Sequence, residues 1–119
     1  IQSNTLEINM AKGEDNPIKR AIINAANGDN EIIAAVSGHR FRILGYTITA
    51  TDATAVTFES PTNTVMTGVM QLAAKGGIDC TVTHIGCLET ATEGAALNLA
   101  VTADVDGHLS YQEFTEITT

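Results

Sequence analysis

Residues 102–114 decide the fold class of this chain and read TADVDGHLSYQEF. Read as an EF-hand calcium loop, the stretch has acidic residues at positions three and five, Gly at six and Glu at twelve. Thr102, however, stands where an EF-hand needs its first carboxylate ligand. Read as a β segment, the same stretch is the end of a strand, an Asp-Gly turn and a closing strand.

The flanking residues favour the β interpretation. Residues 97–101 place Leu, Leu and Val at every second position, a pattern typical of a strand and not of an entering helix. We therefore predict a hairpin with residues 104–107 as its turn and residues 108–117 as the final strand. A loose surface calcium site on Asp104 and Asp106 remains open as the alternative.

The rest of the chain has the same β character. Thr, Val and Ile recur in short runs, and turn signals separate these runs at roughly 8–12-residue intervals, the rhythm of a sandwich or barrel. Residues 40–51 form the longest predicted strand. The phase of its apolar residues changes near Gly45, which predicts either a bulge there or a central strand covered on both sides.

Residues 19–26 are compatible with a helix or a strand, but the turn sequence at 27–30 favours a hairpin with residues 31–36. Further strands are predicted at residues 56–59, 65–72, 78–88 and 97–101. The expected fold is all-β: a single antiparallel β-sandwich, roughly seven to nine strands in residues 18–119. Residues 1–17 are mostly polar and are predicted to be an extended N-terminal arm or a loosely held edge strand.

Charge and hydropathy limit the possible partners. The net charge is −8, and all six Lys and Arg residues lie at or before Lys75. This balance argues against nucleic-acid binding. It is compatible either with a solvated acidic surface or with a face that docks on a basic partner. No apolar run approaches the roughly 20 residues of a membrane helix, so we expect a soluble protein that does not enter a membrane.

The cysteines suggest one metal site, which we do not favour. Cys80, His84 and Cys87 form a conceivable zinc cluster, but the spacing matches no common structural site and a fourth ligand is missing nearby. On a strand, Cys87 faces away from the other two unless Gly86 bulges. We interpret both cysteines as small buried apolar residues.

No catalytic signature is present. The chain has neither G-x-S-x-G nor H-E-x-x-H, and its three histidines are scattered. The carboxylate pairs Asp104/Asp106 and Glu113/Glu116 suit a solvated turn and a strand end better than acid–base catalysis. The few aromatic residues are expected to pack in the core. We expect no enzyme activity, no metal and no cofactor.

Several strand-and-turn segments together resemble a known family. They are residues 34–48 (AAVSGHRFRILGYTI), 56–58, 72–78 (LAAKGGI), 92–99 (TEGAALNL) and 107–111 (GHLSY). In this order, over residues 21–114, the chain is similar to the small β-sandwich proteins of tailed bacteriophages that decorate or cement the capsid. Related sandwich domains occur in phage head fibres and tail tips.

The resemblance implies a jelly-roll-like homotrimer on the capsid exterior of the virion, assembled in the host cytoplasm. It implies the major capsid protein as partner, with each trimer bridging coat subunits, and an ordinary hairpin at residues 102–114 that needs no calcium. The alternative function is a receptor- or carbohydrate-binding module of a head fibre or tail tip. The polar arm at residues 1–17 suits a segment that adds a strand to a neighbouring chain.

Overall fold

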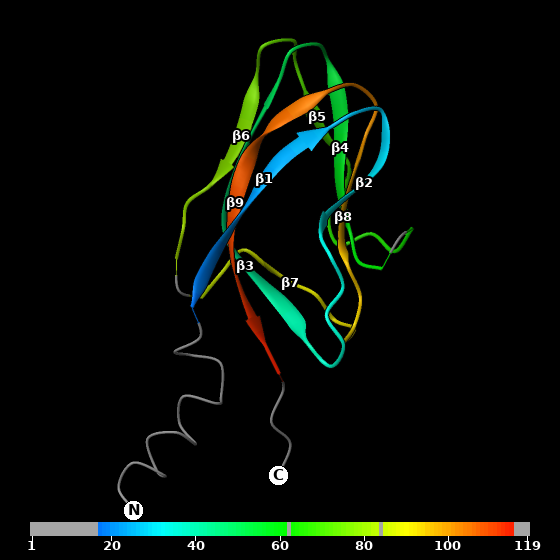
Figure 1. The fold of residues 1–119 in the computed structure, drawn as a ribbon. Coiled ribbons are helices and arrows are strands. Elements are labelled where there is room, and N and C mark those ends of the chain that lie inside the picture. Colours follow the sequence, from blue (N-terminus) through cyan, green and yellow to red (C-terminus); the bar gives the residue numbers. More distant parts are fainter. Residues whose placement is uncertain (1–16, 62, 84, 116–119) are drawn as a thin grey trace, which may run out of the picture.

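Two antiparallel sheets form the protein, and the computed structural model describes residues 17–61, 63–83 and 85–115 (Figure 1). The described residues contain nine strands and no helix: β1 (Ile18–Ala25), β2 (Gly28–Ile33), β3 (Arg40–Ala50), β4 (Thr54–Glu59), β5 (Met70–Leu72), β6 (Gly77–Cys80), β7 (Leu88–Glu89), β8 (Leu97–Val101) and β9 (Val105–Phe114). Sheet A has the order β1-β9-β3-β6, with β7 also paired to β3, and sheet B has the order β2-β8-β4-β5. The predicted all-β class is confirmed.

The core lies between the two sheets. Sheet A contributes Ile23, Phe41, Ile43, Ile48, Val105 and Leu109, and sheet B contributes Val56, Phe58, Leu97, Leu99 and Val101. Along each strand these residues mostly alternate with residues that point outward, as strands covered on one face require. A single core shared by two sheets makes this a β-sandwich.

The longest strand, β3, contains the predicted irregularity. Its pairing with β9 shifts register between Ile43 and Gly45, so Leu44 is an extra residue in the ladder. Phe41 and Ile43 precede the shift, and Ile48 follows it with the opposite parity, yet all three reach the same core. The bulge therefore explains the change of phase, and the prediction of a bulge at this point is confirmed.

The predicted hairpin at residues 102–114 is wrong. β8 pairs with β2 and β4 in sheet B, whereas β9 pairs with β1 and β3 in sheet A, so residues 102–104 cross from one sheet to the other. The Asp-Gly pair is not a turn but lies inside β9. A Cβ at Gly107 would collide with the carbonyl oxygen of Thr47, so glycine here permits close strand pairing.

The predicted hairpin of residues 19–26 with 31–36 is wrong for the same reason. β1 lies in sheet A and β2 in sheet B, and residues 26–27 join them across the edge of the sandwich. Asn30 organises this crossing, since its side-chain amide donates to the carbonyl of Ala26 at 2.7 Å and its Oδ1 accepts from the Ala26 N–H at 3.2 Å. A side chain thus supplies the hydrogen bonds that a hairpin partner would have made.

Two predicted strands are shorter than expected. Residues 65–72 contain strand only from Met70, because residues 60–69 form a connection in which Val65 makes a single bridge to Glu59. Residues 78–88 are interrupted after Cys80, and strand pairing with β3 resumes at β7. Of the predicted arm at residues 1–17, only Pro17 falls within the described residues. No helix in the described part of the chain is long and apolar enough to cross a membrane.

Candidate functional site

Asp104 and Asp106 do not belong to a calcium loop. Asp104 lies in the crossing between the sheets, while Asp106 and Glu113 both lie on β9. Seven residues of extended chain separate these two carboxylates by about 23 Å, whereas calcium ligands must converge to about 2.5 Å from the ion. Among the described residues, no group of three His, Cys, Asp or Glu side chains is placed to hold a metal ion.

Thr102, the residue that replaces the first calcium ligand, has a structural role. Its hydroxyl oxygen accepts a hydrogen bond from the Ala55 N–H at 2.9 Å. In return, the Thr54 hydroxyl oxygen accepts from the N–H groups of Thr102 at 3.2 Å and Ala103 at 3.0 Å. Together with the backbone bond from the Thr102 N–H to the Ala55 carbonyl at 3.3 Å, these bonds tie the crossing to the first residues of β4.

The two cysteines form a disulfide, so their interpretation as small buried apolar residues is wrong. Cys80 and Cys87 are half-buried and bonded, with Cα atoms 6.7 Å apart. The prediction failed because it treated residues 78–88 as one strand, which would hold the two residues about 23 Å apart. Instead the chain leaves the sheet after Cys80 and returns to β3, where the Cys87 N–H donates to the Ile43 carbonyl at 2.7 Å. His84 lies outside the described residues.

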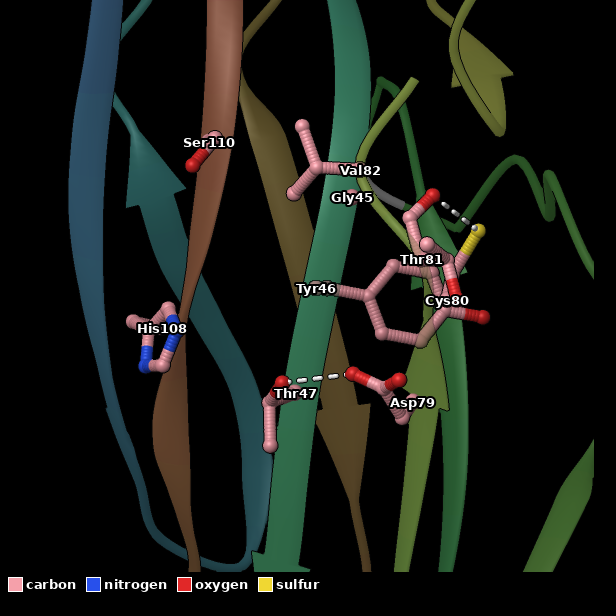
Figure 2. Close-up of a pocket in the computed structure, with 9 residues that line it drawn as sticks. All are labelled: Gly45, Tyr46, Thr47, Asp79, Cys80, Thr81, Val82, His108 and Ser110. Atoms are coloured by element: carbon pink, nitrogen blue, oxygen red, sulfur yellow. Dashed lines mark hydrogen bonds between the residues drawn. The ribbon is translucent and has the colours of Figure 1, made fainter.

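The disulfide-closed loop forms one wall of a groove on the outer face of sheet A (Figure 2). Val82 lies across Gly45, where a Cβ would come within 2.6 Å of a Val82 methyl carbon. The groove has a volume of about 210 Å³ and is lined by residues of β3, β6 and β9 and of the loop. Figure 2 shows His108 and Ser110 on β9 and the hydrogen bond from the Thr47 hydroxyl to Asp79, which measures 2.7 Å.

Tyr46, which lines this groove, has a raised pKa. Burial raises the pKa of its phenol above the ordinary value of 10.0, and the nearby Asp79 carboxylate raises the pKa further. The ring lies 5.1 Å from that of Phe58 in the core. Both causes favour the neutral phenol in the folded protein.

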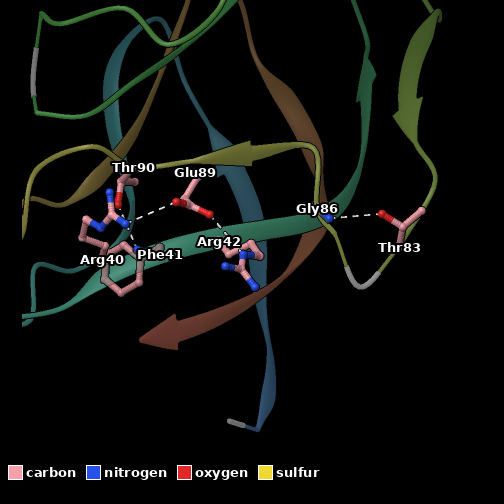
Figure 3. Close-up of polar contacts among 7 residues, drawn as sticks. All are labelled: Arg40, Phe41, Arg42, Thr83, Gly86, Glu89 and Thr90. Carbon is pink, nitrogen blue, oxygen red and sulfur yellow. Dashed lines mark hydrogen bonds and ion pairs between the residues drawn. The ribbon is translucent and has the colours of Figure 1, made fainter. Parts of the chain in front are cut away.

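A second polar cluster joins β7 to the first residues of β3 (Figure 3). Glu89 on β7 accepts from Arg40 Nη2 at 3.3 Å and from Arg42 Nε at 3.1 Å. Both guanidinium groups also lie over the ring of Phe114, at 5.0 and 5.1 Å from its centroid. The cluster fastens the short strand β7 to β3 and covers an aromatic ring on the outer face. Sequence reasoning missed it, because its members lie far apart in the chain.

Two contacts bring basic side chains to Glu113 at one end of β9. His39 Nδ1 lies 2.8 Å from Glu113 Oε2, and Lys19 Nζ lies 3.3 Å from Glu113 Oε1. His108 belongs to the other end of the outer face, beside Thr47 and Ser110.

Searches against protein-family models, curated proteins and solved structures found no match to this chain.

Proposed function

We propose that the protein is a structural virion protein that decorates or cements the outer surface of a phage capsid and bridges coat subunits. The observation that carries this proposal is a set of large apolar side chains exposed on the surface of the β-sandwich. They are Ile18, Ile22, Val65, Val69, Val82 and Ile85, each more than half exposed. Ile18 and Ile22 lie on β1, Val65 and Val69 on the connection after β4, and Val82 and Ile85 on the disulfide-closed loop. Exposed apolar patches are characteristic of surfaces that contact other proteins.

We also infer that the sandwich is a jelly roll. The paired strands are nested in the sequence: β1 with β9, β2 with β8, β3 with β6 and β4 with β5. Each pair of the series lies in the sheet opposite to the pair before it. A long hairpin wound across two sheets has this order, and capsid proteins are among those that use jelly rolls.

The disulfide supports the proposed location on the virion exterior. A bond between Cys80 and Cys87 is maintained in oxidising surroundings, and virion surfaces are one of these. Within the proposal, a trimer assembles in the host cytoplasm, binds the major capsid protein and remains on the outside of the particle, where the disulfide forms after release.

The test compares phage particles with and without this protein. Particles that carry it are expected to show external protrusions in negative stain. They should also retain their DNA at temperatures at which particles without the protein lose theirs. Adding the purified protein back should restore both properties. Identical heat stability and identical outlines in the two preparations would refute the proposal.

A second candidate function is supported by the groove of Figure 2. Its lining includes Thr47, Asp79, His108 and Ser110, which together present hydroxyl, carboxylate and imidazole groups to one small ligand. Such a lining suits a sugar, so the alternative is a carbohydrate- or receptor-binding module of a head fibre or tail tip. Glycan-array binding by the purified protein, lost on Asp79→Ala, is the expected result, and an array without signal would exclude this candidate.

A further inference from the structure

Two exposed surface patches lie on either side of one edge of the sandwich. Both contain apolar residues, and their charged residues have opposite signs. The edge is formed by β1 of sheet A and β2 of sheet B, which residues 26–27 connect. Because each strand ends its sheet on this side, the outer faces of the two sheets meet here as the two flanks of a wedge (Figure 1). The flanks differ in charge, and this difference carries the inference.

The basic flank consists of Ile18, Arg20 and Ile22 on the outer face of β1. These residues alternate with Ile23 and Ala25, which are buried in the core, so they point away from it. Ile18 is 64% and Ile22 78% exposed, the latter the largest exposure among the large apolar residues described. Arg20, between them, is exposed as well. An arginine between two aliphatic side chains is the composition of a contact surface.

The acidic flank lies on the outer face of sheet B. Asp29 and Glu31 are exposed on β2, where they pair with Ala100 and Asn98 of β8. Beside them is a groove of about 220 Å³, lined mainly by aliphatic and small side chains that include Ala55, Ala100 and the 61% exposed Val69, with Asp29 at its rim. An apolar cavity of about 150 Å³ holds a benzene molecule, so this groove has room for an isoleucine side chain.

We propose that the basic flank of one copy docks on the acidic flank of a second copy. Ile22 enters the apolar groove, and Arg20 lies against Asp29 and Glu31. Each partner supplies what the other lacks: aliphatic side chains meet an apolar groove, and a guanidinium meets two carboxylates. The contact deepens the proposed function, because it supplies the self-association on which a bridging decoration protein rests.

The geometry also fixes the type of assembly. The two flanks lie on the outer faces of opposite sheets, so a copy that contacts one flank cannot also reach the other. The contact is therefore heterologous and leaves one free flank of each kind after two copies have joined. A two-fold dimer cannot satisfy it, whereas a closed ring satisfies every flank. Such a ring contains three or more copies.

The test is the mass of the full-length protein, measured by chromatography with light scattering over a concentration series. The wild type is expected to form a closed oligomer of at least three copies. Arg20→Glu and Glu31→Arg should each weaken association about tenfold or more, since they place like charges together. The double variant R20E/E31R restores opposite charges within one chain and should recover the oligomer.

Matched variants separate this contact from general effects. Lys75→Glu makes the same change of charge as Arg20→Glu in the loop between β5 and β6, at the opposite edge of the sandwich, and should leave the mass unchanged. Ile22→Thr should weaken association, while Ile85→Thr, at a residue of similar exposure (76%) outside both flanks, should not. Melting temperatures confirm that each variant is folded.

A wild-type protein that stays monomeric or stops at a dimer would overturn the proposal, and so would a double variant that fails to recover. These outcomes are independent of particle stability. An oligomer that forms as expected but leaves capsids unaffected would refute the proposed function and leave this contact standing.

Discussion

Thr54 is a single buried residue that holds a sheet crossing in place. Its hydroxyl oxygen accepts from the N–H groups of Thr102 and Ala103, and the residue is 4% exposed. Replacing Thr54 with the isosteric Val removes this acceptor. The Thr102 N–H keeps its bond to the Ala55 carbonyl at 3.3 Å, so the loss falls mainly on the Ala103 N–H and should cost about 1–3 kcal/mol of unfolding free energy. Urea denaturation measures this loss. Thr51→Val, which removes an exposed hydroxyl in the neighbouring loop, should change stability much less.

Tyr46 gives the protein a predictable response to alkaline pH. Because its pKa is raised in the folded state, folding favours the protonated phenol. The resulting stabilisation is fully present below the unfolded pKa of about 10 and is lost as the pH rises through the folded pKa. Urea denaturation at neutral pH and at about pH 11 should therefore show a larger loss for the wild type than for Tyr46→Phe. Equal losses would mean that the phenol titrates as in the unfolded chain.

The residue patterns of the sequence predict some of these roles and not others. The mismatch at Thr102 correctly argued against an EF-hand, because a hydroxyl is a poor substitute for the first carboxylate. The hydrogen-bond partner of that hydroxyl, the N–H of Ala55, lies 47 residues away and has no local signature. The sequence pattern predicts Gly107 as a turn residue. In the structure, glycine is required there because Thr47 on the neighbouring strand comes too close for a side chain.

At the scale of strands, alternation of apolar residues predicted which faces are buried but not which strands pair. The pattern at residues 97–101 requires one buried face, and either sheet of a sandwich can provide that face. The choice of sheet depends on contacts that are distant in sequence, such as Val101 with Gly28 and Val56. Local turn signals therefore favoured hairpins at two places where the chain crosses between sheets.

The disulfide between Cys80 and Cys87 is expected to stabilise the edge of sheet A that the loop of residues 81–86 covers. Reduction of the disulfide frees a segment that lies across Gly45 and connects the short strands β6 and β7. The loop-entropy relation for this closure gives a loss of about 2.5 kcal/mol for Cys80→Ser/Cys87→Ser. Denaturant unfolding of this double variant measures the loss, and wild type treated with a reductant should match it.

A loss of unfolding free energy well below about 2.5 kcal/mol would show that the backbone hydrogen bonds of the loop are enough to hold it in place. These are the bonds from Thr83 N–H to the Leu44 carbonyl and from Cys87 N–H to the Ile43 carbonyl. The Glu89 contacts with the two arginines lie beyond the loop and are partly exposed, so they contribute at most about 1 kcal/mol each. Without the disulfide, the edge formed by β7 is therefore the part of the sheet most easily opened.

For the molecule as a whole, the pairing of its first and last strands, β1 and β9, is expected to be a late step of folding. Ile23 in β1 lies opposite Gly107 in β9, whereas Ile48 in β3 lies opposite Ile78 in β6, much nearer in sequence. Closing the longer loop costs more chain entropy, so β1 is expected to dock after β3 and β6 have paired.

Two matched deletions of one methyl group test this order. Ile23 and Ile48 are both fully buried, and Ile→Val at either site should cost about 0.5–1.5 kcal/mol. In stopped-flow chevron measurements, Ile48→Val should mainly slow folding, while Ile23→Val should mainly accelerate unfolding. The opposite assignment would mean that the ends of the chain meet early. In that case the β1–β2 edge, which carries both proposed docking flanks, would form with the nucleus and not as the last part of the sandwich to close.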